Sequence, residues 1–277
     1  MHSDVTDLRD FYATPLGLVT RRLILRAART ALQNRPLGTL LGLGFATPYL
    51  SAFKSHAQRV IAVMPARQGA LVWPPEGKKQ VILCEEEDLP IPDNSVDTLL
   101  VAHGLEMADR PQPFLREIWR VLTPEGRLLI IVPNRRGIWA RLDTTPFGYG
   151  RPFSRGQLER LLTSAMFTPR QWDTALYMPP FTQSLFVRSA VGWERMGSRF
   201  MQNFAGAIIV EAVKEMSAPA GKVQTSRSLA ELAGTGRLVQ TPGLVPTPQK
   251  QADQSPPART RNHEAPVPNA ATKPIAT

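Results

Sequence analysis

The chain has 277 residues, of which 43% are hydrophobic and 20% are charged. That content is enough for a sizeable buried core, so the composition excludes a wholly disordered protein. A single cysteine, Cys84, excludes a disulfide scaffold, and the spacing of the four histidines indicates no metal site. The formal net charge of +10 indicates non-specific attraction to acidic partners rather than any particular fold.

The first residues of the chain are acidic rather than basic. Asp4, Asp7 and Asp10 stand where a secretory signal peptide carries a basic region followed by an apolar one. Further along, no apolar run approaches the roughly 18 residues that are needed to span a bilayer. We therefore expect a cytoplasmic protein without a membrane span, with Cys84 reduced.

The first predicted helix covers residues 14–33. Thr14 is a suitable N-cap, and Pro15 occupies the first helical position, where its missing N–H costs nothing. Apolar residues then recur at helical spacing. Three arginines share the opposite face of this helix: Arg22, Arg26 and Arg29. Two interpretations of this face stay open, namely an ordinary solvated surface or a contact surface for RNA or another phosphate-rich partner.

Short aliphatic runs alternate with further helical patterns after the first helix. Helices are predicted over 49–57 and 111–122, and another opens at Ser154, where Gln157 completes a capping box. The predicted strands are 39–43, 60–63, 81–83, 98–102, 128–132 and 207–210. Fully apolar runs separated by helices are typical of a parallel sheet covered on both faces. The sequence therefore predicts a doubly wound α/β domain, with its ligand outside the carboxyl ends of the strands.

The composition changes near residue 217. From there to the end, the chain is rich in Pro, Ala, Thr and Gln and has few large apolar residues. Such a segment cannot bury enough surface to offset the loss of chain entropy. We expect a folded domain over 1–217 and a disordered tail over 218–277. The tail is interpreted either as a solvated extension or as a partner-binding arm.

Two segments that suit ligand binding follow predicted strands. After the first strand, Gly42, Gly44 and Ala46 would let a ligand approach the backbone closely, although tight strand-to-helix turns also use glycine for local reasons. A run of four acids follows the third strand: Glu85, Glu86, Glu87 and Asp88. These acids either accept hydrogen bonds from an amine or hydroxyl of a ligand or form a solvated loop.

A long stretch of the chain resembles a known family. The matching text is Glu87-Asp-Leu-Pro-Ile-Pro-Asp-Asn-Ser-Val-Asp97, His103-Gly-Leu-Glu106 and the run from Phe114 to Asn134. It resembles the class I S-adenosylmethionine-dependent methyltransferases of the ubiquinone-biosynthesis-like (type 11) group. The resemblance covers roughly 39–214 and is strongest over 85–134. It implies a seven-stranded, mostly parallel sheet with helices on both faces, a core over 39–134 and a closing antiparallel strand over 207–214.

The resemblance also implies a binding site for the cofactor S-adenosylmethionine. The three small residues after the first strand would approach its methionine part and ribose. The acids from Glu85 to Asp88 would lie at the adenine edge, where an acid accepts from the exocyclic amine. His103 would end the fourth strand near the sulfonium, with Glu106 in the next turn. Such sites align an electrophilic methyl group with a nucleophile, so positioning and desolvation supply most of the acceleration.

The sequence departs from the usual pattern of the family at three places. Gly42 replaces an acid of the first motif, Met64 stands at the position of the ribose-binding acid, and Met107 replaces a second histidine after the fourth strand. Losing the charge-assisted bonds to the ribose weakens binding about tenfold to a hundredfold unless another group substitutes. Two functions stay open: a methyltransferase with an unidentified acceptor, or an inactive methyltransferase-fold binding or regulatory protein.

The loop after the fifth strand is the candidate acceptor site. Its arginines and aromatic residues suit an acidic or planar small molecule, through bidentate hydrogen bonds and stacking. The candidate residues are Arg135, Arg136, Trp139, Arg141, Tyr149 and Arg151. In the alternative interpretation, the aromatic residues pack beneath the loop and the arginines are solvated. We expect residues 135–205 to form this loop and a lid.

Overall fold

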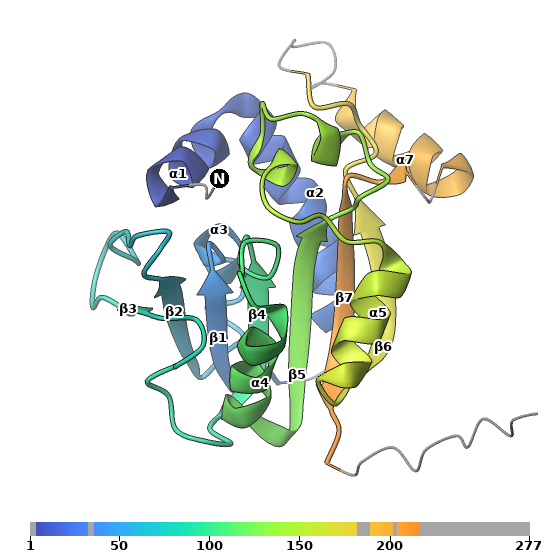
Figure 1. Cartoon of the computed structure of the whole chain (residues 1–277). Helices are drawn as coiled ribbons and strands as arrows, with labels where there is room; N and C mark the ends of the chain where they lie inside the picture. The colour runs from blue at the N-terminus through green and yellow to red at the C-terminus, as the bar shows by residue number, and fades with distance from the viewer. Residues whose placement is uncertain (1–3, 33–35, 182–188, 202–203, 217–277) are drawn as a thin grey trace, which may run out of the picture. The chain divides into compact units, whose positions relative to one another are not determined.

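The computed structural model describes residues 4–32, 36–181, 189–201 and 204–216. Within this part, seven strands form one sheet in the order β3-β2-β1-β4-β5-β7-β6 (Figure 1). The strands are β1 (Thr39–Gly44), β2 (Arg59–Pro65), β3 (Val81–Cys84), β4 (Val96–Ala102), β5 (Leu122–Pro133), β6 (Phe167–Ala175) and β7 (Ala207–Lys214). β7 runs antiparallel to β5 and β6, and the other neighbouring strands are parallel. The predicted fold class, with its closing antiparallel strand, is confirmed.

Helices cover both faces of this sheet (Figure 1). One face carries α2 (Pro15–Leu32) and α3 (Thr47–Leu50), and the opposite face carries α4 (Pro111–Val121) and α5 (Arg155–Ser164). α1 (Val5–Ala13) lies over the carboxyl ends of the strands and packs against α2 (Figure 1). The remaining described helical segments are η1 (Trp139–Arg141), η2 (Pro146–Gly148) and α7 (Ala190–Phe200). The first turn of α5 has the predicted capping box, in which Ser154 and Gln157 bond to each other's backbone N–H.

The core forms two layers because successive strand residues face opposite sides of the sheet. Leu40 and Leu100 pack among residues of α1, α2 and α3, whereas Leu41 and Leu99 pack with α4 and α5. All four leucines are fully buried. A fully buried leucine contributes about 1.5–3 kcal/mol relative to an exposed one. The aliphatic runs that predict the strands therefore also hold both helical layers against the sheet.

Two helices near the N-terminus differ from the prediction. α1 lies outside the predicted helices, although Asp4 caps it by accepting from the Thr6 N–H at 2.8 Å. The helix predicted over 49–57 is wrong in its extent, since α3 is a single turn that ends at Leu50. The residues that follow form turns, and Lys54 to His56 are exposed. Phe53 is buried in this segment, but a single buried side chain is not the apolar stripe that would stabilise further helical turns.

The strand β6 is missing from the predicted strands. It lies at the edge of the sheet and pairs only with β7, with a register shift between Pro169 and Gln171. Most of its side chains are half-buried rather than buried. An edge strand of this kind needs no continuous apolar run and accepts a proline, so its sequence does not show the pattern that identifies the central strands.

Only some of the remaining sequence-based expectations concern residues that the structure describes. Arg22, Arg26 and Arg29 are exposed on α2, which agrees with both interpretations of that face. The expected tail over 218–277 and residues 182–188 of the expected lid lie outside the described residues. Among the residues that are described, no helix is both long enough and apolar enough to cross a membrane.

Candidate functional site

Parallel pairing brings the ends of four strands to one edge of the sheet. Gly44 at the end of β1 pairs with Ala102 at the end of β4, and Pro65 at the end of β2 pairs with Cys84 of β3. The strand order reverses between β1 and β4. Open α/β sheets bind ligands outside the strand ends at such a switch point. The residues predicted for the cofactor site follow these strands and are thereby brought to one region.

Glycine is needed for close packing at the end of β1. Gly44 has a φ of +82°, and a Cβ there would lie 2.4 Å from the carbonyl oxygen of Ala102. A Cβ on Gly42 would lie 2.5 Å from a methyl carbon of Leu50. Ala46 is also buried, directly before α3. The local interpretation of these small residues therefore holds, and their cofactor role stays a prediction.

A buried series of polar side chains lies at the end of β4. The Tyr12 hydroxyl is 2.6 Å from the Tyr49 hydroxyl and 2.8 Å from His103 Nε2. His103 Nδ1 is 3.4 Å from the Glu106 carboxylate. The His103 side chain is 2% exposed and that of Glu106 is 1% exposed. The imidazole ring also makes edge contacts with Tyr12 and Phe147, so α1 and η2 cover it.

The chemistry of these groups indicates which atoms donate. A carboxylate only accepts, so a proton on His103 Nδ1 suits the Glu106 side, and Nε2 then accepts from the Tyr12 hydroxyl. Burial raises the pKa of Tyr12 and of Tyr49 above the ordinary tyrosine value, so both hydroxyls stay protonated. Among the described residues, His103 Nδ1 and the carboxylate oxygens of Glu106 have no hydrogen-bond partner. Native proteins leave only a few buried polar groups without a hydrogen bond, so these atoms are candidates to meet a ligand.

The acidic run after β3 has exposed and buried members. Glu85 and Asp88 are exposed, and Glu87 accepts from Arg110 Nε at 3.0 Å. Glu86 is 8% exposed, and its Oε2 is buried without a hydrogen-bond partner in the described part of the chain. Glu86 is therefore the member of the run that offers a buried acceptor to a ligand.

Glu86 borders a very small cavity between the ends of β2, β3 and β4. The cavity has a volume of about 10 Å³ and is lined by Pro65, Arg67, Gln68, Glu86, Gly104 and Met107. Such a volume holds about one water molecule. The Gln68 side chain is 4% exposed and donates to the backbone carbonyl of His103. A ligand as large as a nucleoside fits here only after Gln68 moves aside.

Met64 stands at the predicted ribose-binding position but belongs to the apolar core. Its side chain is 2% exposed, and its sulfur accepts from the Leu71 N–H at 3.2 Å. A thioether in this position supplies no charged acceptor for ribose hydroxyls. The Glu86 carboxylate lines the same cavity as Pro65, the residue after Met64, so an acid is present there from β3 rather than β2.

The predicted acceptor loop does not form a single site. Trp139 is 1% exposed, packs edge-on against Phe147 and donates its indole N–H to the Met178 carbonyl at 2.7 Å. This indole is a core residue and cannot stack on an acceptor in this conformation, which is a correction to the prediction. Arg135 and Arg141 are exposed on the same loop.

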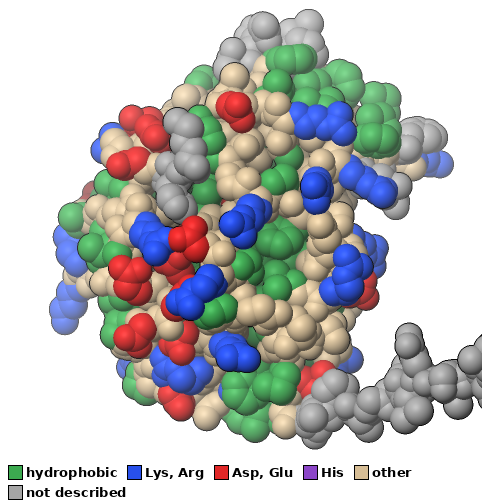
Figure 2. Space-filling model, in the orientation of Figure 1, with side chains coloured by type: hydrophobic (Ala, Val, Ile, Leu, Met, Phe, Trp, Pro, Cys, Tyr) green, Lys and Arg blue, Asp and Glu red, His purple; other side chains and the backbone are tan. Residues whose placement is uncertain are grey.

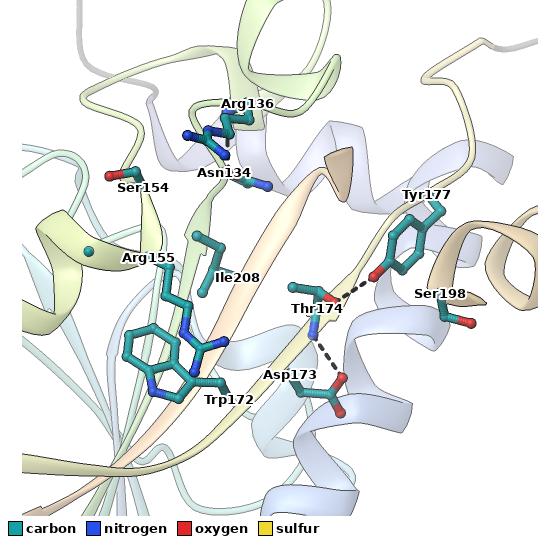
Figure 3. A pocket seen from close by; sticks show the side chains of 11 residues that line it. Asn134, Arg136, Ser154, Arg155, Trp172, Asp173, Thr174, Tyr177, Ser198 and Ile208 are labelled. Atoms are coloured by element: carbon teal, nitrogen blue, oxygen red, sulfur yellow. Dashed lines mark hydrogen bonds between the residues drawn. The ribbon is translucent and has the colours of Figure 1, made fainter. Parts of the chain in front are cut away.

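The other loop residues line two separate cavities. Tyr149 and Arg151 border a cavity of about 650 Å³ together with Glu106, Asp109 and Asp143. Arg136 borders a different cavity, of about 590 Å³, between α5 and β6 (Figure 3). The sequence pattern identified His103 and Glu106 but missed Tyr12, Tyr49 and Gln68, because tertiary packing alone brings them to the strand ends.

Comparison with known proteins agrees with this architecture. Residues 39–130 match the family described as Methyltransferase domain. In this part the chain is similar to that family, which agrees with the resemblance of its sequence to the class I S-adenosylmethionine-dependent methyltransferases. A solved S-adenosylmethionine-dependent methyltransferase from Thermotoga maritima is 16% identical and matches 76% of this chain and 96% of its own, with a TM-score of 0.52. At that identity, the likeness concerns the methyltransferase fold alone.

Two curated relatives of this methyltransferase domain are the ubiquinone/menaquinone biosynthesis C-methyltransferases UbiE of Azotobacter vinelandii and Rubrivivax gelatinosus. The first is 40% identical over 137 residues, which is 48% of this chain and 51% of the relative. The second is 33% identical over 124 residues, which is 44% of this chain and 47% of the relative. The match to this chain thus spans about half the length of these relatives.

The residues at the strand ends fit S-adenosylmethionine on one condition. The Glu86 Oε2 atom, which has no hydrogen-bond partner among the described residues, suits a hydroxyl or amine donor, and the buried Glu106 carboxylate, 3.4 Å from His103 Nδ1, suits a nearby cation. The similarity to the Methyltransferase domain family makes S-adenosylmethionine the cofactor to expect. The condition is displacement of the Gln68 side chain, which now occupies the space beside Glu86.

The packing around Gly44 predicts a large loss of stability on substitution. Gly77 is a matched control, because its φ is +78° but a Cβ there would meet nothing within 4 Å. Gly77→Ala should lower the free energy of unfolding by about 1–2 kcal/mol, from backbone strain alone. Gly44→Ala should lower it by a further ~1–3 kcal/mol, because the added Cβ collides with Ala102. Urea unfolding measures both, and equal losses would contradict the packing role.

Cys84 reports on the electrostatics of the acidic run. Burial, and after it the negative charges of Asp88 and Glu85, raise the pKa of the Cys84 thiol to about 11. Because the thiolate is the nucleophile, iodoacetamide at pH 8 should modify Cys84 at least about tenfold more slowly than free cysteine, and the rate should rise up to about pH 11. Asp88→Asn should speed the reaction, whereas the control Glu125→Gln should not. A rate that levels off below pH 9 would contradict this assignment.

Proposed function

We propose that the chain is an S-adenosylmethionine-dependent methyltransferase that acts on a planar small molecule. The observation that carries the proposal is a pair of buried acidic side chains, Glu86 and Glu106, beside His103 at the switch point of a methyltransferase fold. Glu86 Oε2 and both carboxylate oxygens of Glu106 accept no hydrogen bond from the described residues. Each of these groups costs free energy in the absence of a partner. A cationic, hydroxyl-bearing ligand would supply the partners they lack.

The cofactor would lie across the carboxyl ends of β1 to β4. Its methionine part and ribose would pass over the backbone of Gly42, Gly44 and Ala46. Its adenosine would lie along the run from Glu85 to Asp88, with Glu86 accepting from a hydroxyl or from the amine. This assignment gives Glu86 the part that the family assigns to an acid at the position of Met64.

His103 and Glu106 would handle the proton that leaves the acceptor. When bound, the cofactor supplies an electrophilic methyl group. His103 Nε2 is the acceptor nitrogen in the favoured tautomer and now bonds to the Tyr12 hydroxyl. An acceptor hydroxyl or carbon acid in the place of Tyr12 would give its proton to Nε2, and Glu106 would stabilise the imidazolium. The imidazole is therefore the proposed general base, and Glu106 its orienting partner.

The acceptor would enter through the 650 Å³ cavity beside Glu106. The Tyr149 ring and the Arg151 guanidinium suit a planar, hydroxylated ring, by stacking and hydrogen bonding. Asp143 on the same lining disfavours a strongly anionic acceptor, whereas the charge of Asp109 is compensated by its ion pair with Arg67. The relatives' description as ubiquinone/menaquinone biosynthesis C-methyltransferases supports an aromatic acceptor. Of the two acceptor types that the sequence leaves open, we therefore favour the planar one.

A second candidate function is a methyltransferase-fold binding or regulatory protein without catalysis. Two observations favour it: Met64 is buried in the core in place of an acid, and Gln68 fills the nucleoside space. In this case the region at the strand ends would stay closed, and the chain would bind a protein partner rather than the cofactor.

Titration calorimetry of the full chain with S-adenosylmethionine and S-adenosylhomocysteine separates the two candidates. We expect micromolar binding that Glu86→Gln weakens at least about tenfold, because it removes a charge-assisted acceptor. The matched control is Glu159→Gln, an exposed acid on α5. Absence of heat up to millimolar ligand would reject the enzyme and favour the binding protein.

Methyl transfer from radiolabelled S-adenosylmethionine to catechol or 1,4-naphthohydroquinone tests the proposed base. His103→Asn should lower turnover about 10²-fold or more while cofactor affinity changes little. Asparagine is chosen because the φ of His103 is +49°, a conformation that asparagine tolerates. Glu106→Gln should lower turnover by a smaller factor than His103→Asn, because the imidazolium loses the carboxylate that orients and stabilises it. Unchanged turnover in His103→Asn would exclude this residue as the base.

A further inference from the structure

A second large cavity lies apart from the strand ends of β1 to β4. It has a volume of about 590 Å³ and is bordered by the end of β5, by β6 and β7, by the start of α5 and by α7 (Figure 3). That size is typical of small-molecule sites. Ile208 of β7 points into it, and Trp172 and Tyr177 stand on either side (Figure 3). The cavity therefore has an apolar floor between two aromatic side chains.

The polar lining of this cavity is mainly basic. Arg136 and Arg155 both border it, and among the described residues neither guanidinium forms an ion pair. The one carboxylate on the lining, that of Asp173, accepts from the Thr174 backbone N–H at 2.7 Å. On the surface around α5 and α7, Lys and Arg side chains gather with few acids among them (Figure 2). An anion is thus attracted both to the cavity and to its approaches.

Arg155 is held ready to bind such an anion. Its guanidinium carbon lies over the Trp172 ring, 4.8 Å from the ring centre, which is a cation–π contact. This contact restrains the guanidinium, whose N–H groups can form bidentate bonds to a carboxylate or phosphate. Gly156, without a side chain, follows Arg155 on the lining and leaves the first turn of α5 open to the cavity.

Hydroxyl and amide groups stand opposite Arg155. The hydroxyls of Thr174 and Tyr177 lie 2.6 Å apart and share one hydrogen bond, so further hydrogen-bonding capacity is left for a ligand. Asn134 and Arg136 border the end near β5 (Figure 3). The Asn134 side chain already donates to the Ala205 carbonyl and accepts from the Arg136 backbone N–H. The Thr174 and Tyr177 hydroxyls are therefore the groups that can hold the far end of a flat molecule whose ring covers Ile208.

We propose that this cavity is a binding site for an aromatic anion, that is, a flat ring system bearing a carboxylate or a phosphate. The anionic group bonds to the guanidinium of Arg155, the ring lies over Ile208, and Arg136 compensates the remaining charge. The site does not depend on the proposed methyl transfer, because none of the residues assigned to cofactor or acceptor binding in that proposal borders it.

Titration calorimetry of the full chain with matched probes tests this site. The probes are 2-naphthoate and 1-naphthyl phosphate, with neutral 2-naphthalenemethanol and non-aromatic cyclohexanecarboxylate as controls. We expect at least one of the two anionic aromatic probes to bind at least tenfold tighter than either control. The comparison of the two anions identifies carboxylate or phosphate as the native group. Equal affinity for the neutral probe, or no binding of either anionic probe, would overturn the proposal.

Variants of the arginines that line the cavity test where the probe binds. Arg155→Ala and Arg136→Ala should each lower the affinity for the more tightly bound anionic probe at least about fivefold. Arg155→Lys should lower it by an intermediate factor, because lysine keeps the positive charge but lacks the planar guanidinium. The matched control Arg160→Ala, an exposed arginine of the same helix outside this lining, should have no effect. Binding should persist in Glu86→Gln and with S-adenosylhomocysteine present. If binding is unchanged in both Arg155→Ala and Arg136→Ala, or if it is lost in Glu86→Gln, the site is elsewhere and the proposal fails.

Discussion

The contact between the end of β1 and the end of β4 is the constraint on which the rest of the site depends. Without a side chain on Gly44, the backbone of Ala102 and Gly104 approaches to distances that a Cβ would not allow. This approach sets the course of the chain after β4, where His103 takes a left-handed backbone conformation. The imidazole is thereby turned beneath α1, and the regions proposed for cofactor and acceptor meet around it. A change at Gly44 would move all of these groups together.

The polar groups that are buried at this contact lower the stability of the fold, and they are also the groups proposed to bind ligands. The carboxylates of Glu86 and Glu106 are removed from water without hydrogen-bond partners, and packing of the two hydrophobic layers must offset that cost. The same packing places α1 and Gln68 over the strand ends, so the structure is closed where the cofactor is proposed to bind. Binding would therefore be coupled to a local rearrangement, and affinity would be reduced by the free energy of opening. The cavity beside Arg155 needs no such rearrangement, since it is already open to a ligand of moderate size.

Strong periodic signals predicted the central elements because those elements are defined by burial alone. The central strands read as aliphatic runs, and the capping box at Ser154 marks the start of α5. The misses have a common cause. β6 is an edge strand with half-buried side chains, and α1 is a short helix that packs against α2 and η2, which its own sequence does not show. The helix predicted beyond Leu50 ends early because Lys54 to His56 are exposed and leave Phe53 as an isolated buried side chain.

The amino-acid sequence by itself determined the fold class, the strands at the centre of the sheet and the region of the acidic run, because hydrophobic periodicity and a specific motif over 85–134 do not depend on distant residues. Only the tertiary structure decided which polar side chains are buried and which of them meet. It placed Tyr12 on His103, kept Glu86 unpaired, put Trp139 in the core and divided the arginines of one loop between different surfaces. Burial and contact between residues far apart in the chain follow from the packing of whole elements, and no local pattern encodes them.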